Sequence, residues 1–315
     1  MPELRVATRG SALALAQARI VADGLQAAWP GLEVTLVRVV TEGDRRRDQA
    51  TSQLGGKGVF TAAVQQAVLD GRADLAVHSA KDLPAGQIPG LALGAVPPRE
   101  DPRDVLVTAH PAHPADPLDA LPTGSRVGTG SPRRVALLSW LRPDLELAPL
   151  RGNVDTRVGK VAAGELDAVV LAESGLRCLG LPAGATGQLD PEVFMPAPGQ
   201  GCLAVEARVV DRRVVDLLAA LSHEPSRAAL EGERAFLSRL GGSCTLPAGA
   251  LLTVAADGAL EARGFLAALD GKGLVRERIT GPPADPAALG RALADRLLAA
   301  CGPEVRDLIE GSRQA

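Results

Sequence analysis

The sequence predicts an α/β protein with two similar lobes built on mainly parallel sheets and a smaller C-terminal α+β domain. Three observations support this prediction. The first part of the chain alternates short apolar strands with amphipathic helices, which is typical of parallel sheets covered by helices. The same arrangement recurs further along, and the last third changes to a helix followed by closely spaced strands.

The first lobe begins with a buried strand at 4–8, "LRVAT", and a helix whose apolar residues keep helical spacing. Ser11 is suited to cap that helix, because a serine hydroxyl accepts a hydrogen bond from the first turn. A second strand at 34–40, a helix at 61–71 that ends at glycine, and a third strand at 73–79 follow. This β-α-β-α-β order favours one mainly parallel sheet.

The second lobe repeats the plan of the first. "RVGTGSPRRVALLSWL" at 126–141 matches "RVATRGSALALAQA" at 5–18, since each has a strand, a threonine, a Gly-Ser pair and then a helix. "GELDAVVLAES" at 164–174 matches "GRADLAVHSA" at 71–80 in the same way. Chance similarity between α/β units is the alternative explanation, but two matches in the same order favour two lobes of one design.

The chain is expected to cross between the lobes twice, at "PPREDPRD" (97–104) and at "PAPGQG" (196–201), which together would form a hinge. A strand at 202–207 then returns to the first lobe. The predicted division is residues 1–100 and 200–219 for the first lobe, 101–199 for the second lobe and 220–315 for the C-terminal domain. That domain is expected to contain the helix "ERAFLSRL", strands at 249–255, 259–268 and 273–280, and a last helix at 286–300.

Composition excludes several classes of protein. Of 315 residues, 46% are hydrophobic but only 2% aromatic, so aromatic platforms for stacking nucleic-acid bases are not expected. The net charge of −3 gives no basic field that would attract nucleic acid or a membrane. With no signal-peptide pattern and no apolar stretch long enough to span a bilayer, we expect a cytoplasmic protein. The four cysteines are far apart and form no Cys-x-x-Cys pair, so no metal site is expected.

Both lobes place a serine, Ser11 or Ser131, at a strand-to-helix turn. Because a helix N-terminus offers unpaired N–H groups and partial positive charge, these serines are candidate carboxylate or phosphate ligands, with plain helix caps as the alternative. Arg9, Arg133 and Arg134 lie beside the two turns. Positive charge at a helix start is unfavourable, which suggests a ligand that supplies the negative charge.

Further cations stand on loops and strand ends. Arg151 and Arg157 occur in "LRGNVDTR", and Lys57 occurs in the glycine loop "GGKG". Arginine binds carboxylates through two parallel hydrogen bonds. The cleft between the lobes is therefore expected to accept a ligand with several carboxylates.

"HSAKDLP" at 78–84 follows the third strand, and the carboxyl ends of such strands face the ligand crevice. His78, Lys81 and Asp82 are therefore expected near it. Asp82 is a candidate acid/base carboxylate whose pKa is tuned by neighbouring cations. A solvated Lys–Asp pair in a turn is the alternative.

One thiol, Cys244, lies in the glycine-rich stretch "RLGGSCTLP". Glycines end the preceding helix and Pro247 cannot extend one, so the stretch is expected to be an exposed loop. A buried core cysteine is one interpretation. A reactive or chemically modified thiol is the other, since loops held on a scaffold often carry function.

Five motifs follow one another along the chain: "HSAKDLP", "GTGSPRR", "LRGNVDTR", "PAPGQG" and "GGSCTLP". In this order and spacing they resemble the porphobilinogen deaminase family over nearly the whole chain. The resemblance implies a dipyrromethane cofactor joined to Cys244 by a thioether. It implies head-to-tail condensation of four porphobilinogen molecules with loss of ammonia, then hydrolytic release of hydroxymethylbilane. A monomer is the family expectation.

The resemblance also implies roles for the candidate residues. Asp82 is the expected catalytic residue. The cofactor would be bound by Lys81, Ser131, Arg133, Arg134, Arg151 and Arg157, and the substrate by Arg9, Ser11 and Lys57.

Several positions depart from the family pattern: Cys178 stands where arginine is usual, Glu173 and Ser174 where small apolar residues are typical, Gly241 where Glu is frequent, and Ser243 where glycine is frequent. Glu173 would repel an anionic substrate unless it points away or pairs with Arg177.

Two rival functions use the same fold class. One is a non-enzymatic anion-binding protein with two lobes of the periplasmic-binding-protein type. The other is a transferase in which Cys244 is a nucleophile that turns over.

Overall fold

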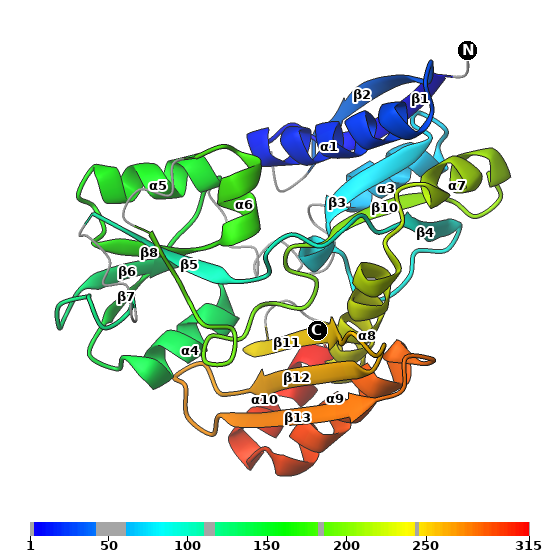
Figure 1. Cartoon of the computed structure of the whole chain (residues 1–315). Helices are drawn as coiled ribbons and strands as arrows, with labels where there is room; N and C mark the ends of the chain where they lie inside the picture. The colour runs from blue at the N-terminus through cyan, green and yellow to red at the C-terminus, as the bar shows by residue number, and fades with distance from the viewer. Residues whose placement is uncertain (1–2, 42–60, 110–116, 182–185, 243–245, 315) are drawn as a thin grey trace.

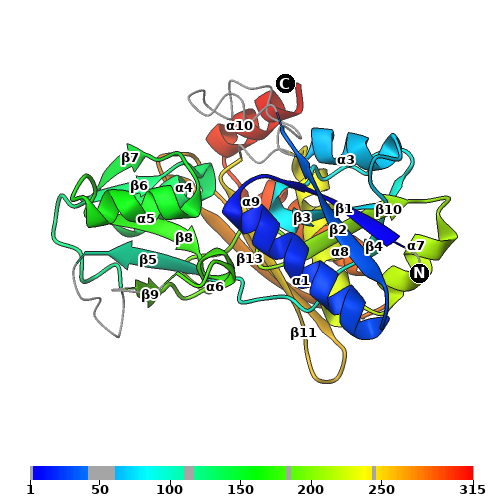
Figure 2. The same ribbon diagram turned by 90° about the horizontal axis from the view of Figure 1, so that it is seen from above.

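The computed structural model describes residues 3–41, 61–109, 117–181, 186–242 and 246–314. Within these residues the chain forms two five-stranded sheets and one three-stranded sheet. The two larger sheets belong to lobes that lie side by side, and the C-terminal domain packs against both (Figures 1 and 2). Lys57, Cys244 and Ser243 lie outside the described residues.

The first lobe is built on the strands β1 (Glu3–Arg9), β2 (Glu33–Val39), β3 (Leu75–Ser79), β4 (Leu91–Ala95) and β10 (Leu203–Arg208). Their order is β2-β1-β3-β10-β4, with β1 parallel to β2 and β3, and β10 antiparallel to β3 and β4. The helices packed on this sheet are α1 (Ala12–Ala28), α3 (Ala62–Leu69) and α7 (Arg212–Ala219). The predicted β-α-β-α-β order and its parallel start are confirmed.

The second lobe has the strands β5 (Asp104–Thr108), β6 (Arg126–Thr129), β7 (Glu146–Pro149), β8 (Ala168–Ala172) and β9 (Thr186–Gln188), in the order β7-β6-β8-β5-β9. Its helices are α4 (Pro132–Leu141), α5 (Val154–Ala162) and α6 (Glu173–Cys178). The predicted recurrence is confirmed, because β6 is parallel to β7 and β8 just as β1 is parallel to β2 and β3. In each sheet, the strand that follows a crossing, β5 or β10, is antiparallel to both neighbours.

The C-terminal domain is an antiparallel sheet with helices packed on it. Its elements are α8 (Glu224–Leu240), β11 (Ala248–Val254), β12 (Leu260–Leu266), β13 (Val275–Gly281), α9 (Pro286–Ala300) and α10 (Pro303–Gln314). The three predicted strands are confirmed, whereas α10 extends the structure beyond the last predicted helix. Helices α8 and α9 touch through glycines, since a Cβ added to Gly290 would overlap the carbonyl oxygen of Gly232.

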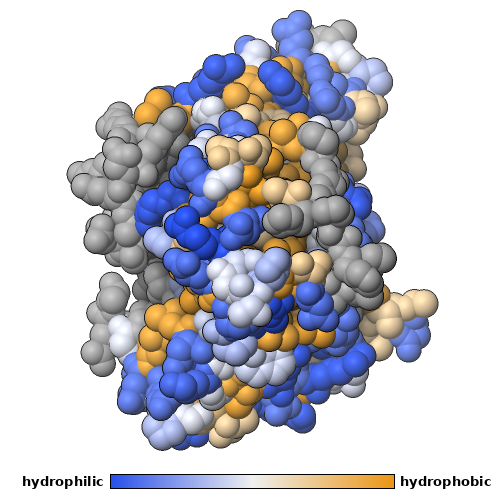
Figure 3. Space-filling model, turned by 90° about the vertical axis from the view of Figure 1, so that its left-hand side faces the viewer, coloured by the Kyte–Doolittle hydropathy of each residue, from blue (hydrophilic) through white to orange (hydrophobic). Residues whose placement is uncertain are grey.

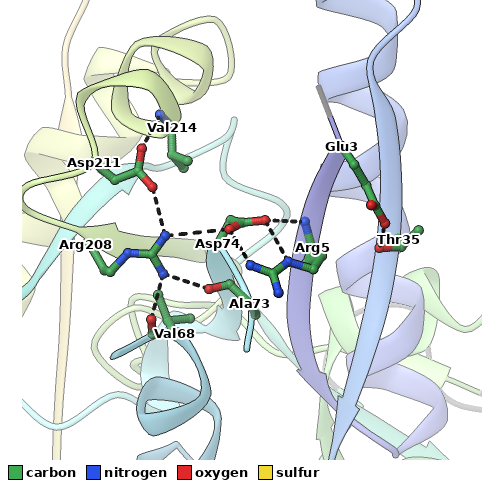
Figure 4. A network of polar contacts seen from close by, with 9 residues as sticks. All are labelled: Glu3, Arg5, Thr35, Val68, Ala73, Asp74, Arg208, Asp211 and Val214. Carbon is green, nitrogen blue, oxygen red and sulfur yellow. Dashed lines mark hydrogen bonds and ion pairs between the residues drawn. The ribbon is translucent and has the colours of Figure 1, made fainter. Parts of the chain in front are cut away.

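A polar network (Figure 4) fixes one end of the first-lobe sheet. The Lys81 turn, a 3₁₀ turn at Ala80–Asp82 that follows β3, lies at the opposite end. Asp74, just before β3, accepts hydrogen bonds from the backbone N–H of Arg5 at 2.8 Å and from its guanidinium at 3.0 Å. Arg208 of β10 lies 3.6 Å from Asp74 and 2.8 Å from Asp211, which caps α7. Three elements distant in sequence are thereby joined at one sheet end.

In the view of Figure 3 the second lobe faces the viewer, and polar and apolar side chains are interspersed over this face. Among the described residues, no helix has the length and apolar character needed to cross a membrane.

Both crossings are anchored to α8 by one buried carboxylate. Glu233, which is fully buried, pairs with Arg99 of the first crossing at 2.6 Å. The same carboxylate accepts hydrogen bonds from the backbone N–H of Gly199 in the second crossing at 2.5 Å and of Leu252 in β11 at 2.8 Å. Arg99 also donates to the carbonyl oxygen of Gln200 at 2.9 Å. The position of the two lobes relative to the C-terminal domain therefore depends on this contact.

We expect Glu233→Gln to lower the free energy of unfolding by about 3 kcal/mol, because it leaves a buried guanidinium without its counter-charge. Calorimetry or denaturant titration measures the change. Asp295→Asn is the matched control, since it breaks an exposed ion pair with Arg239 and should cost less than about 1 kcal/mol. Equal losses in the two variants would contradict the anchoring role.

Candidate functional site

A cavity of about 110 Å³ lies between the two lobes. Its walls come from α1 and the Lys81 turn of the first lobe, from α4, α5 and α6 of the second lobe, and from both crossings. Gly199 and Gly201 contribute to the wall, and both have positive φ values of 76° and 85° that favour glycine. The cavity therefore forms where the sequence predicted the hinge.

Three cations line this cavity: Lys81, Arg134 and Arg157. Burial, and then the nearby charge of Arg134, lower the pKa of Lys81 to about 8. Burial and the same guanidinium lower the pKa of Arg157. Because like charges destabilise one another in a partly desolvated cavity, an anionic ligand would relieve this repulsion.

Arg133 and Arg134 have a protein counter-ion that sequence reasoning missed. Asp104, the first residue of β5, is fully buried and lies 2.7 Å from Arg133 and 2.8 Å from Arg134. The two guanidiniums hold the pKa of the Asp104 carboxyl well below its usual range. Asp104 thus supplies one negative charge to two guanidiniums, so the positive charge at the start of α4 is partly compensated within the protein. Arg134 still reaches the cavity wall.

Gln200 connects this arginine cluster to Lys81. It is almost fully buried, accepts a hydrogen bond from Lys81 Nζ at 3.4 Å and donates one to Asp104 Oδ1 at 2.9 Å. It also donates to the carbonyl oxygen of Pro102 in the first crossing at 2.7 Å. Sequence reasoning treated the Gln200 segment only as a crossing, although an amide flanked by glycines was a signal that could have found it.

Asp82 ends a single 3₁₀ turn, Ala80–Asp82, that directly follows β3. Its side chain is exposed, and its charge acts on both Lys81 and Arg157. The carboxylate therefore lies near the cations of the cavity. His78 does not share this position, because it is buried within the first lobe, 3.2 Å from Glu206.

The two serines differ in what they do. Ser11 is a helix cap, since its Oγ accepts a hydrogen bond from the N–H of Ala14 at 3.3 Å. Ser131 stands at the equivalent position of α4 but makes no capping bond with its side chain. Its backbone N–H donates to Thr129 Oγ1 at 3.2 Å. The Ser11 hydroxyl is therefore used as a helix cap, and the Ser131 hydroxyl is not.

The remaining candidates do not form the wall of the cavity. Arg9 ends β1 and is half-buried, whereas Arg151 is exposed between β7 and α5. Within the described part of the chain, the cavity wall does not include Arg9, Ser11, Asp82, Ser131, Arg133 or Arg151. No cluster of three or more possible metal ligands occurs among the described residues.

Two of the unusual positions have physical explanations. Glu173 pairs with Arg177 at 2.7 Å one helical turn away, so its charge is compensated. Gly241 caps α8 with φ of 113°, a conformation that side chains rarely adopt. Cys178 lines the cavity, and burial together with the charge of Glu100 raises the pKa of its thiol.

Comparison with known proteins identifies relatives over most of the chain. Residues 4–216 match the family model "Porphobilinogen deaminase, dipyromethane cofactor binding domain", and residues 228–299 match "Porphobilinogen deaminase, C-terminal domain". A porphobilinogen deaminase of Roseiflexus castenholzii is 49% identical over 299 residues, covering 95% of this chain and 97% of that protein. One from Moorella thermoacetica is 46% identical over 305 residues, covering 97% and 96%.

Among solved structures, a periplasmic binding protein of Salmonella typhimurium is similar with a TM-score of 0.39 and 13% identity, over 70% of this chain and 92% of that one.

The lowered pKa of Lys81 predicts a pH-dependent stability. The folded protein binds this proton less tightly than the unfolded chain, whose lysine has the ordinary pKa of 10.5. The resulting stability cost is fully present below about pH 8 and disappears as the pH rises towards 10.5. In protein free of bound small molecules, Lys81→Met should therefore raise the melting temperature at pH 7.5, and the gain should vanish by about pH 10.5.

Lys272→Met is the control for this titration, because Lys272 is exposed and its pKa is raised by Asp270. Calorimetry across the pH range measures both variants. A pH-independent effect of Lys81→Met would contradict the buried, repelled ammonium described above.

Proposed function

This chain belongs to the porphobilinogen deaminase family, and we propose that the family reaction takes place in the cavity between its two lobes. The protein is a transferase that joins four porphobilinogen molecules head to tail with loss of ammonia and releases hydroxymethylbilane by hydrolysis. The observation that carries the proposed location is the set of mutually repelling cations Lys81, Arg134 and Arg157 in the cavity wall. Family membership favours this enzyme over a non-enzymatic anion-binding protein.

The chemistry of the substrate fits these cations. Each pyrrole carries an acetate and a propionate, so every added unit brings two carboxylates that need compensation. Ion pairs and charge-assisted hydrogen bonds from guanidinium groups supply it. We assign cofactor binding to Lys81, Ser131, Arg133, Arg134, Arg151 and Arg157, and substrate binding to Arg9, Ser11 and Lys57. Because Lys81, Arg134 and Arg157 line the cavity, we propose that these three also contact the carboxylates of the incoming porphobilinogen.

The matched family domain binds a dipyrromethane cofactor, and we propose that Cys244 carries it through a thioether. The start of the Cys244 loop supports this placement. Gly242 lies against the segment that follows Asp82, since a Cβ on Gly242 would be 3.3 Å from the Cβ of Ala85. Arg234 of α8 donates to the carbonyl oxygen of Ala85 at 3.3 Å, which holds the same two segments together. When bound, the cofactor supplies a pyrrole carbon as the nucleophile for the first substrate.

Asp82 is proposed as the catalytic residue. When the C–N bond of the aminomethyl group breaks, both bonding electrons leave with nitrogen as ammonia, and positive charge develops on the substrate pyrrole. An exposed carboxylate next to the cavity stabilises that charge and hydrogen-bonds the pyrrole N–H. Asp82 would also accept the proton that the attacked pyrrole carbon releases when the new C–C bond forms.

The proposed division of the chain is residues 1–100 with 200–219, residues 101–199 and residues 220–315. It is supported by the placement of β10 within the first-lobe sheet and of β5 within the second. We further propose a cytoplasmic monomer whose partner is the small molecule porphobilinogen, with no nucleic acid or membrane partner.

Asp82→Asn is expected to lower turnover by at least about a hundredfold, because the amide cannot stabilise the developing cation or take the proton. The side chain is exposed, so the melting temperature should be unchanged. Product formation from porphobilinogen measures the effect. Asp216→Asn, an exposed change on α7, is the control. Near-normal turnover in Asp82→Asn would contradict the catalytic role assigned to Asp82.

Arg157→Leu is expected to raise KM for porphobilinogen roughly tenfold or more, since a charge-assisted contact to a carboxylate is lost. Arg212→Leu removes the same charge from an exposed position on α7 and serves as the matched control. Steady-state kinetics with porphobilinogen measure KM for both variants. If the two variants behave alike, the cavity does not bind the substrate carboxylates.

A further inference from the structure

The wall of the cavity contains one acidic residue among the described residues, Glu100 of the first crossing. Backbone contacts fix its position. The N–H of Glu100 donates to the carbonyl oxygen of Gly201 at 3.0 Å, and a Cβ on Gly201 would overlap the carbonyl oxygen of Glu100. The two crossings are therefore in direct contact at this residue, and its carboxylate is not needed to hold them together.

The carboxylate of Glu100 is not used by the described part of the chain. It has no hydrogen bond or ion-pair partner there, and it acts only at longer range on Cys178 and Arg177. Arg177 has its own partner, since its guanidinium lies 2.7 Å from Glu173. Glu100 is exposed, so its carboxylate is free to meet a cation that enters the cavity.

The cavity thus has two kinds of charge on its wall, the cations Lys81, Arg134 and Arg157 and the single anion Glu100. Porphobilinogen has the complementary distribution. It carries two carboxylates and, at neutral pH, a protonated aminomethyl group. Carboxylate binding alone would not distinguish this substrate from pyrroles that lack the amine, whereas an acid in the same cavity would.

We propose that Glu100 binds the ammonium group of the incoming porphobilinogen while the cations bind its carboxylates. This assignment rests on the proposal that condensation takes place in this cavity. It gives Glu100 a role in substrate selection that differs from that of Asp82, because the Glu100 contact is to the leaving group. The ion pair exists before the C–N bond breaks and ends when neutral ammonia departs.

The test compares porphobilinogen with its 2-hydroxymethyl analogue, which keeps both carboxylates but has a neutral leaving group. For Glu100→Gln holoenzyme, kcat/KM for porphobilinogen should fall roughly tenfold, mainly through KM, and kcat/KM for the analogue should change less than about twofold. Glu100→Asp should restore part of the preference for the amine. Glu165→Gln, which removes an exposed carboxylate outside the cavity wall, should leave both values unchanged.

Equal losses with the two substrates, or no loss with either, would overturn the assignment of Glu100 to the ammonium group. The proposed reaction site is tested separately by Asp82→Asn and Arg157→Leu. Impaired turnover in those variants together with an unchanged substrate preference in Glu100→Gln would refute only the role assigned to Glu100.

Discussion

The buried ion pair between Glu233 and Arg99 is the contact on which the arrangement of the lobes depends. Glu233 also binds the backbone N–H of Gly199, so a single carboxylate on α8 holds both crossings. A buried charge of this kind is tolerated only when its hydrogen-bonding capacity is satisfied, and here an arginine and two backbone N–H groups satisfy it. The C-terminal domain thereby holds both crossings in place.

The chemistry of the cavity follows from that anchor. Gln200, next to the anchored Gly199, lies between Lys81 of the first lobe and Asp104 of the second. Asp104 supplies one negative charge to the two guanidiniums of Arg133 and Arg134, so Lys81 and Arg157 remain close to positive charge that the protein does not fully neutralise. A cavity with surplus positive charge suits a product that gains two carboxylates in each cycle, and the anchored crossings keep that charge in place.

The features that could be predicted from the sequence are those that depend on neighbouring residues or on a periodic pattern. The Ser11 cap, the strand-helix alternation and the recurrence of "RVATRGS" as "RVGTGSPRR" are encoded within a few residues of one another, so they could be predicted. The partner of Arg133 and Arg134 could not be predicted in the same way, because Asp104 approaches them only when β5 enters the sheet beside β8. The partners of Gln200 and the place of Glu100 in the cavity wall could not be predicted for the same reason, since they come from the contact of two crossings that are distant in sequence. Lys57 and Cys244 lie outside the described residues, so their roles stay predictions.

The intact mass of the denatured protein, measured beside a Cys244→Ser variant, tests the central claim most directly. Protein made in a host that supplies porphobilinogen is expected to carry an excess mass equal to two linked pyrrole units, and the variant is expected to lack it. The excess should also persist through turnover, unlike the adduct of a nucleophilic thiol that is regenerated in every cycle. A bare mass in the unmodified sequence, or the same excess in Cys244→Ser, would contradict attachment of the cofactor at this residue.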